Sequence, residues 1–444
     1  MFMGGGLSGW GRAQMLPDPP SFVVSPGFFA ESAAFLITST RGSGARSRSR
    51  IPFIKPGGRS MHGSVLLSAC CVASLSLVAA GGDPPEVIAE GLVLPIGIEA
   101  DPNDQIWISE MGAPSPKDPP GTPGAGRISM LASDLDGTYT QVPLVENIQV
   151  AFNAMNEPAG VHHISFAPDG SLLLATGGPN VPTAFPYLGS VLRYDPSYPV
   201  LMDGPHAVDG AALLQQVPIF PYVRQVAGYP DSNTYAAIQV DRKLWIADAG
   251  ANAVIQYDLD LESYSVLVEL PNKTNPKGTT PPFSQAVPTR IIADGQGGAY
   301  LVELTGFPFI AGNADVYRLA ADGTLTTVAS GLQTLLDVAV ASDGSLLVSS
   351  GGDFDPDSGL PAMGAGSVIR VRQDGSTTTL IDGLWIPSGL EVVGDDVYVA
   401  QMLFGTITRY PGIAPRSCVG DLNGDGRVDG ADMGLLISTW GVCP

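Results

Sequence analysis

Oxygen-bearing side chains recur at a fixed spacing in residues 421–432. The segment reads Asp-Leu-Asn-Gly-Asp-Gly-Arg-Val-Asp-Gly-Ala-Asp. Its side-chain oxygens fall at loop positions 1, 3, 5, 9 and 12, which are Asp421, Asn423, Asp425, Asp429 and Asp432. Gly426 at position 6 permits a sharp turn, and Arg427 at position 7 can contribute its main-chain carbonyl. The spacing predicts a loop that wraps a hard cation, Ca²⁺, because such cations prefer several oxygen ligands.

The calcium loop also resembles known modules. Its spacing is that of an EF-hand loop, and Asp at position 12 together with the apolar segment Met433–Trp440 resembles a type I dockerin repeat. The resemblance implies calcium binding, a short helix and a cohesin-like or surface partner for the tail. Dockerins normally hold two repeats and this sequence has one, so a cohesin partner does not follow from it. An association with polysaccharide degradation rests on analogy alone.

Two of the four cysteines bracket this loop. Cys418 and Cys443 would remain after Cys70 and Cys71 leave with a cleaved leader. In a secreted protein the remaining pair is expected to form a disulfide that closes a module at 418–443, which is too small to have its own core. Closing a loop of about 25 residues would contribute roughly 3 kcal/mol by the chain-entropy model.

A second set of polar residues accompanies short β-forming segments in residues 86–412. Four follow the second strand of a repeated unit: Glu110, Asp248, Glu303 and Gln401. Four more occupy positions of expected inner strands: His162, Asn233, Arg290 and Asp337. A ring of such oxygens could hold a cation such as Ca²⁺, as a sugar-lactone hydrolase would require. The alternative is structural, since buried strand-end carboxylates commonly cap main-chain N–H groups of neighbouring blades, and this is the expected role of Asp248 and Glu303.

The sequence holds one adjacent histidine pair, His162-His163. In a regular strand neighbouring side chains point to opposite faces, so at most one of the two would reach a central axis. This argues against a metal site built on both histidines. We also find no Gly-x-Ser-x-Gly elbow, P-loop, dinucleotide fingerprint or His-Glu-x-x-His motif. The motifs therefore do not identify an enzyme.

A repeated sequence pattern predicts the strands that position these residues. A turn followed by a short strand of β-formers occurs six times, beginning at Pro102, Pro168, Val240, Gly295, Ser342 and Gly394. Each copy is followed by another strand, which often holds Arg or Tyr. The strands are rich in β-branched and aromatic residues and bounded by Asp-Gly and Gly-Gly turns. The spacing of the copies suits four-stranded propeller blades.

A second repeated segment indicates how the ring of predicted blades closes. Thr326–Leu332 and Thr378–Leu384 lead into the fifth and sixth copies, and Glu86–Leu92 repeats the same pattern before the first. No such strand follows Thr406–Tyr410 before Cys418. The N-terminal strand is therefore expected to supply the outer strand of blade six, which removes free sheet edges. We predict an all-β, six-bladed propeller over residues 86–412.

Several segments of the propeller resemble the ScyD/ScyE family of secreted propellers. The most specific is Tyr300–Phe309, and Ala314–Arg318, Trp245–Val254 and Pro387–Leu390 support it. The resemblance implies a periplasmic or extracellular propeller and carries no established ligand or mechanism. More distantly, Asp248 and Asn252 are similar to the strand-end residues of NHL-type repeats.

Composition excludes several classes of protein. The 55 glycines and 39 prolines make up about a fifth of the 444 residues, and charged residues are only 15%. Long helical and coiled-coil architectures are therefore excluded, and the glycines lack the three-residue period of collagen. The net charge is −21. An acidic chain is a poor match for nucleic acid or an anionic membrane, which require basic patches.

The first 80 residues differ in composition from the rest. Residues 1–60 hold an Arg-Ser-Arg-Ser-Arg tract and no periodicity, and they are interpreted as a disordered or over-extended N-terminus. Residues 61–80 fit a signal peptide, with the apolar run Ser64–Ala80 after a basic zone. A membrane anchor and a lipoprotein at Cys70 are the alternatives. Without the leader, residues 81–444 carry 15 basic and 41 acidic groups, a net charge of −26.

These observations predict a secreted, periplasmic or extracellular binding or scaffold protein. A glycan, small molecule or protein would bind the propeller, and the Ca²⁺ tail would attach it to an assembly or the cell surface. The enzyme alternative is a metal-dependent hydrolase of lactones or glycans, with the axial carboxylates as ligands.

Overall fold

The computed structural model describes residues 83–112, 126–134, 138–152, 158–178, 186–197, 205–275, 281–354, 361–416, 420, 422 and 428–441. The expected N-terminal extension 1–60 and signal peptide 61–80 lie outside these residues. So do both cysteines of the expected disulfide and four of the expected calcium ligands: Asp421, Asn423, Asp425 and Arg427.

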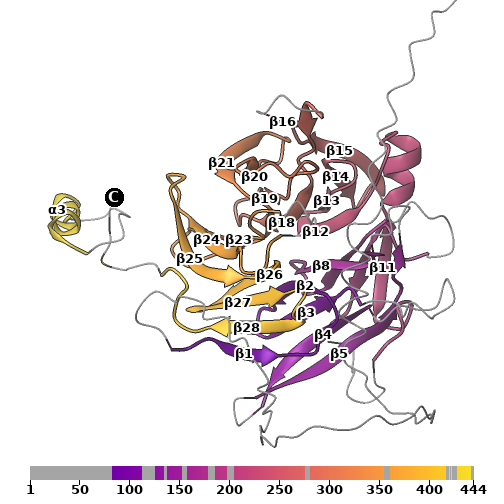
Figure 1. The fold of residues 1–444 in the computed structure, drawn as a ribbon, viewed down its shortest axis with the longest axis horizontal. Helices are drawn as coiled ribbons and strands as arrows, with labels where there is room; N and C mark the ends of the chain where they lie inside the picture. Colours follow the sequence, from indigo (N-terminus) through magenta and orange to yellow (C-terminus); the bar gives the residue numbers. More distant parts are fainter. Residues whose placement is uncertain are drawn as a thin grey trace, which may run out of the picture.

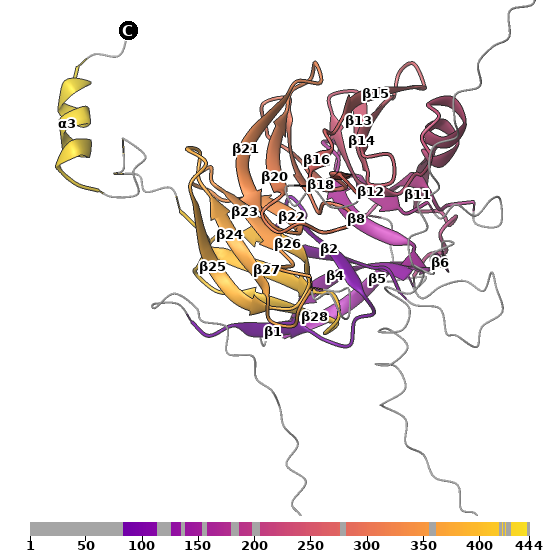
Figure 2. The same cartoon turned by 45° about the horizontal axis from the view of Figure 1, so that its top comes forward.

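Six four-stranded antiparallel sheets surround a common axis in Figures 1 and 2. Blade 1 contains β2 (Pro95–Ala100), β3 (Ile106–Glu110), β4 (Gly126–Ser133) and β5 (Tyr139–Ile148). Blade 2 contains β8 (Val161–Phe166), β9 (Leu172–Thr176), β10 (Ser190–Tyr194) and β11 (Leu213–Pro218). Blade 3 contains β12 (Thr234–Val240), β13 (Lys243–Asp248), β14 (Ala253–Asp258) and β15 (Ser263–Glu269).

The remaining three blades follow the same order. Blade 4 contains β18 (Pro288–Ala293), β19 (Ala299–Glu303), β20 (Ala314–Leu319) and β21 (Leu325–Leu332). Blade 5 contains β22 (Leu335–Val340), β23 (Leu346–Ser350), β24 (Gly366–Val371) and β25 (Thr377–Leu384). Blade 6 contains β26 (Pro387–Val393), β27 (Asp396–Gln401), β28 (Thr406–Tyr410) and β1 (Glu86–Ala89).

The N-terminal strand closes the ring. Strand β1 pairs antiparallel with β28, so that Glu86 lies opposite Arg409 and Val87 opposite Thr408. Each end of the propeller chain therefore contributes to blade 6. The predicted all-β, six-bladed propeller closed by its N-terminal strand is confirmed.

Hydrophobic packing occurs between the blades. The described core divides into six clusters, and each is formed by residues from two neighbouring blades. Blades 6 and 1, for example, bury Ile88, Ile98 and Tyr398 together. Second strands such as β3 and β9 are buried along their whole length because neighbouring blades cover both of their faces, whereas outermost strands such as β25 are largely exposed.

A repeated ion pair fastens the strands of four blades. In three blades an Arg on the third strand contacts an Asp in the turn between the first two strands, and in blade 6 it contacts the first residue of the second strand: Arg193 with Asp169, Arg318 with Asp294, Arg370 with Asp343, and Arg409 with Asp396. In the first three pairs the Asp also accepts a main-chain N–H bond within its turn, as Asp294 does from Gln296 at 2.7 Å. The Arg that the sequence repeat places in the third strand therefore stabilises the start of the second strand in the same blade.

The longer connections carry small elements. These are β6 (Ala151–Phe152), β7 (Pro158–Ala159), the π-helical turn η1 (Tyr222–Val226), β16 (Lys273–Thr274) and β17 (Phe283–Ser284). Beyond the blades, α3 (Gly430–Ser438) lies outside the ring in both views (Figures 1 and 2). No helix of the described residues combines the length and apolarity needed to cross a bilayer.

Candidate functional site

Every inner strand leaves one edge unpaired at the axis, since it is the end strand of its sheet. These free main-chain groups are capped by side chains of the preceding blade at all six junctions. Four hydroxyls donate to carbonyls of the next inner strand: Ser388 to Pro95 (2.7 Å), Ser109 to His162 (2.7 Å), Ser165 to Ala237 (2.6 Å) and Thr289 to Leu335 (2.9 Å). Asn252 Oδ1 accepts from Val287 N at 2.7 Å between blades 3 and 4.

Carboxylates cap N–H groups in the same direction around the ring. Asp337 of blade 5 accepts from Leu390 N of blade 6 at 2.8 Å. Glu391 of blade 6 accepts from Ala100 N of blade 1 at 3.3 Å. Each of these carboxylates also accepts from the residue that follows it, Val338 N and Val392 N respectively, both at 2.7 Å. The axial acids are thus acceptors for the backbone of the ring.

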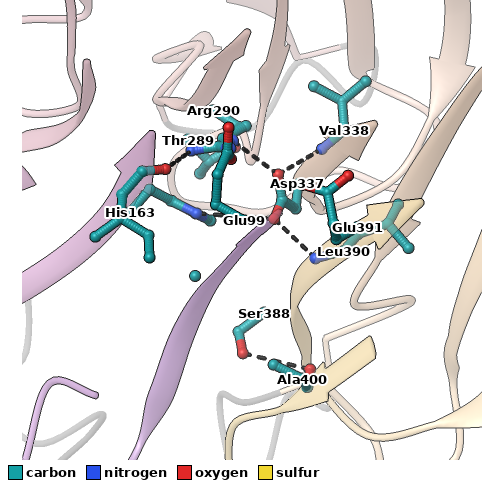
Figure 3. Close-up of polar contacts among 12 residues, drawn as sticks. Glu99, His163, Thr289, Arg290, Asp337, Val338, Ser388, Leu390, Glu391 and Ala400 are labelled. Carbon is teal, nitrogen blue, oxygen red and sulfur yellow. Dashed lines mark hydrogen bonds and ion pairs between the residues drawn. The ribbon is translucent and has the colours of Figure 1, made fainter. Parts of the chain in front are cut away.

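Arg290 crosses the axis and joins four blades (Figure 3). From β18 its Nη1 donates to the carbonyl of Ile164 at 2.8 Å, and its Nη2 donates to Glu99 Oε2 at 2.5 Å. Its Nε lies 3.0 Å from Asp337 Oδ1 as an ion pair. The Arg290 side chain is 2% exposed. A guanidinium presents a rigid fork of donors, which suits one residue to several partners.

Two carboxyls, Glu99 and Asp337, contact this guanidinium, and a third, Glu391, interacts with it electrostatically. Burial raises the pKa of Asp337 to about 7, although Arg290 opposes the shift. Burial raises the pKa of Glu391 to about 8, and the neighbouring charge of Glu99 adds to the rise. Burial also raises the pKa of Glu99, against the attraction of Arg290. At neutral pH the three carboxyls therefore hold at least one proton between them, because a single Arg cannot compensate three neighbouring charges in a largely desolvated site.

The two histidines lie beside this group. A register shift between Val161 and Ile164 interrupts the regular alternation of β8. As a result both imidazoles contact Tyr235, His162 stacked at 4.2 Å and His163 tilted at 5.7 Å between ring centroids. The expected separation of the pair onto opposite faces, which assumed a regular strand, is therefore wrong.

Both imidazoles are buried and neutral. Burial lowers the pKa of His162 to about 4, even though its Nδ1 lies 2.8 Å from the carbonyl of Thr234. Burial and the charge of Arg290 lower the pKa of His163 well below its usual value. His163 Nδ1 lies 3.7 Å from Asp337 Oδ2, and neither ring nitrogen of His163 has a hydrogen-bond partner.

The four strand-end residues are the last residues of β3, β13, β19 and β27. Three hold the segment that enters the inner strand of their own blade. Glu110 accepts from Val93 N at 2.8 Å, Asp248 from Asn233 N at 2.8 Å, and Gln401 from Trp385 N at 3.2 Å. These contacts agree with the expected capping role of Asp248, within one blade rather than between blades.

Glu303 is part of a buried polar network in blade 4. It forms an ion pair with Lys273 and accepts from Asp315 N at 2.9 Å. Lys273 Nζ also lies 2.7 Å from Asp315 Oδ2 and 2.6 Å from Tyr317 Oη. Burial raises the pKa of Glu303 to about 7 against the pull of Lys273. Its Oε2 is buried with no hydrogen-bond partner.

The structure therefore divides the eight propeller candidates. Arg290 and Asp337 meet at the axis, whereas Glu110, Asp248, Glu303 and Gln401 each serve their own blade. His162 contacts blade 3 through the Thr234 carbonyl and the Tyr235 ring. Asn233 is close to His162, since a Cβ added at Gly177 would lie 2.6 Å from His162 Cε1 and 2.8 Å from Asn233 Oδ1.

Sequence reasoning missed Glu99 and Glu391, although a signal existed. Leu-Pro-Ile-Gly-Ile-Glu ends at Glu99 and Ile-Pro-Ser-Gly-Leu-Glu ends at Glu391, so aligning the inner strands would have found both. The shared glycines allow close approach of neighbouring strands. A Cβ at Gly97 would lie 3.2 Å from His163 Cα, and one at Gly389 would lie 2.7 Å from the Ile96 carbonyl.

In the described part of the tail, two of the expected calcium ligands shape the start of α3. Asp429 accepts from Ala431 N at 2.8 Å, and Asp432 Oδ2 accepts from Asp429 N at 2.7 Å, which together form a capping box. Asp432 Oδ1 accepts from Leu422 N at 2.7 Å, so the carboxylate faces back toward the loop. The helix thus begins at Gly430 rather than at Met433. The described residues contain no group of three or more His, Cys, Asp or Glu arranged to hold a metal.

Comparisons with known proteins identify no family for the chain. No family model matches the chain, and no curated protein matches it. Among solved structures it is similar to a streptogramin B lyase (12% identity, 74% of this chain and 97% of that one, TM-score 0.43). It is also similar to a gluconolactonase from Xanthomonas campestris (13%, 77% and 97%, TM-score 0.46). An auxiliary nutrient binding protein from Bacteroides thetaiotaomicron is similar as well (9%, 72% and 69%, TM-score 0.45). At these identities and TM-scores the likeness gives no function to this chain, and the ScyD/ScyE resemblance stays a prediction.

Proposed function

We propose that the chain is a secreted binding or scaffold protein whose propeller recognises a ligand without transforming it. The observation that carries the proposal is the commitment of the axial acids. Asp337 and Glu391 each accept two main-chain N–H bonds, and Asp337 also faces Arg290. A carboxylate occupied in this way is a support of the ring, and few of its lone pairs remain for a metal or a substrate.

We propose further that the tail attaches the propeller to an assembly or surface through a Ca²⁺-stabilised module. The spacing of the loop oxygens supports this, and Asp432 at position 12 accepts from the N–H of Leu422 at position 2, which brings the two ends of the loop together. The apolar side chains that follow are exposed: Met433 by 64%, Ile437 by 64% and Trp440 by 78%. An exposed apolar helix of this kind suits a docking role.

A glycan and small-metabolite binding screen on the full-length protein tests the proposal. The expected result is saturable binding of at least one compound that is recovered chemically unchanged after prolonged incubation. Conversion of the bound compound into product would contradict it.

A hydrolase remains the second candidate, and Glu303 is the observation in its favour. A buried carboxyl with a pKa of about 7 and one unpartnered oxygen has the properties of a general acid. In this proposal Glu303 would act beside Lys273 and Tyr317 on a lactone or glycoside.

A further inference from the structure

Five aromatic residues, which we call the aromatic row, come from one face of the propeller. They are Phe307, Phe309, Phe354, Trp385 and Phe404. Four lie in the connections between the second and third strands of blades 4, 5 and 6, and Trp385 lies two residues before the inner strand of blade 6. In an antiparallel blade these connections all emerge at the end where the second strands finish.

Contacts link the row across the three blades. Phe307 and Phe309 meet edge to face at 6.2 Å, and Phe309 stacks on Phe354 at 4.0 Å with 9° between the rings. Phe354 bridges to Pro361, whose carbonyl accepts from Trp385 Nε1 at 3.2 Å. Trp385 in turn meets Phe404 edge to face at 5.3 Å. The contacts run without a break from blade 4 to blade 6.

The two ends of the row are exposed. Phe307 is 56% exposed and Phe404 is 45% exposed, whereas the rings between them are half-buried. Trp385 is further fixed by its main-chain N–H bond to Gln401. Exposed aromatic rings on a supported surface are characteristic of binding sites, because single exposed apolar residues are common but linked ones are not.

The charge around the row limits its ligand. The sequence segments 303–315, 351–354, 361–365, 382–390 and 402–405 contain no Lys or Arg. Asp353 and Asp382, which flank Phe354 and Trp385 in sequence, are exposed. The ammonium of Lys273 lies at the base of the first connection, but it is 9% exposed and already paired with Glu303 and Asp315. An anionic ligand would therefore meet exposed carboxylates, and acidic polymers are unsuited to this surface.

Ring geometry separates the remaining ligand classes. A cation is best held where several ring faces point at one place. Here Phe354 covers one face of Phe309, so the row forms a shelf rather than a cage. A neutral sugar offers apolar C–H faces to aromatic rings and hydroxyl donors to carboxylates such as Asp353 and Asp382.

We propose that the aromatic row binds a neutral oligosaccharide chain, which rests on the proposed binding function and specifies its ligand class. The sugar rings would lie on Phe307 and Phe404, and their hydroxyls would donate to the flanking carboxylates.

Calorimetric titration of the full-length protein with neutral hexasaccharides tests the inference, using cellohexaose, xylohexaose and maltohexaose. Hexagalacturonate and hexalysine are titrated beside them as an anionic and a cationic ligand. At least one neutral hexasaccharide is expected to bind, and Phe307→Ala combined with Phe404→Ala should raise its Kd at least tenfold. Leu261→Ala is the matched control. Leu261 is 74% exposed in the turn between β14 and β15, at the opposite end of the blades, and its loss should leave Kd unchanged.

Other results would overturn the inference. One is that no neutral hexasaccharide binds, and another is that Leu261→Ala raises the Kd as much as the double variant does. A third is that hexalysine binds in 0.5 M salt and that this binding is lost in the double variant. Assay of the titrated samples for new reducing ends keeps the two proposals apart. Cleavage of a bound sugar would contradict the non-catalytic function but would leave the aromatic row as the binding site. Absence of both binding and cleavage would contradict only the proposal that the aromatic row binds a sugar.

Discussion

Arg290 is the residue on which the axis depends most. Its guanidinium is the cation that Glu99 and Asp337 contact, and it also donates to the main chain of blade 2. Removing one partner of a buried ion pair leaves an uncompensated charge, which costs far more than losing an exposed pair. Substitution of Arg290 is therefore expected to lower the free energy of unfolding measurably.

Arg290→Met is predicted to lower the free energy of unfolding by about 3–5 kcal/mol, since it strands buried carboxyls. Arg242→Met is the control, because Arg242 and its partner Asp260 are 64% and 59% exposed. That variant should lose less than about 1 kcal/mol. Urea unfolding at pH 7 measures both. Equal losses in the two variants would show that the axial network contributes nothing special.

The raised carboxyl pKa values predict that the protein loses stability as pH rises. Glu391 has an ordinary pKa of 4.5 and a folded value of about 8. Between these values the unfolded chain has released a proton that the folded chain still holds, so rising pH favours unfolding. The loss is complete above the folded pKa. Asp337, with a folded pKa of about 7, acts in the same direction.

Thermal unfolding between pH 6.5 and 8.5 isolates this effect. The lowered pKa of His162, about 4, removes stability only as pH falls below 6.5, outside that range. The Tm of the wild type should fall across the range, and Glu391→Gln should reduce the fall, with a Tm a few degrees above wild type at pH 8.5. Parallel curves for the two proteins would contradict the assignment of a proton to Glu391.

At the scale of elements, the blades could be predicted and the axis could not. Turn chemistry and β-branched runs are local signals, so the six phrases and the closing strand Glu86–Ala89 were readable from the sequence. Side-chain direction in the inner strands was not readable. All six inner strands have a register shift near their first residues, which disrupts the two-residue alternation.

A backbone irregularity accompanies the shift in four blades. The residue directly before the inner strand has a left-handed conformation: Leu94 (φ 52°), Val287 (φ 57°), Thr334 (φ 48°) and Ile386 (φ 48°). Such a conformation is costly for branched side chains and persists only where the surroundings hold it. Val93, two residues before β2, and Trp385, two before β26, are held by Glu110 and Gln401. The polar candidates thus mark where the chain is bent into the axis.

The closing strand provides a prediction of its own. Ile88 is 7% exposed in the cluster between blades 6 and 1, whereas its neighbour Val87 is 56% exposed. Ile88→Ala should therefore cost about 2 kcal/mol or more of unfolding free energy, and Val87→Ala less than about 0.5 kcal/mol. Denaturant titration of both variants makes the comparison. A negligible loss for Ile88→Ala would mean that β1 does not help to close the ring.

The tail is predicted to bind one Ca²⁺ independently of the propeller. Isothermal titration should give a stoichiometry near one for the wild type, and Asp425→Ala should abolish binding because it removes a loop oxygen. The melting temperature of the propeller should not respond to chelator. Calcium binding that survives Asp425→Ala, or a chelator-sensitive propeller, would place the cation elsewhere.

At the scale of the whole molecule, the acidity of the chain has two distinct sources. Axial carboxylates such as Asp337 are buried and serve the ring, while exposed ones such as Asp353 face solvent beside the aromatic row. The ring is closed by six capped junctions and six shared cores. Such a rigid frame leaves recognition to the loops at its ends, which is the usual division of labour between scaffold and loops.

Hydrolysis assays test the central claim most directly. The full-length protein would be incubated with glucono-δ-lactone and a panel of nitrophenyl glycosides, with Ca²⁺ and with chelator, beside a Glu303→Ala variant. If the axial carboxylates serve only to support the ring, neither protein should turn over any substrate above the uncatalysed rate. Turnover by the wild type that is abolished in Glu303→Ala would contradict the claim and identify the buried network of blade 4 as a catalytic centre.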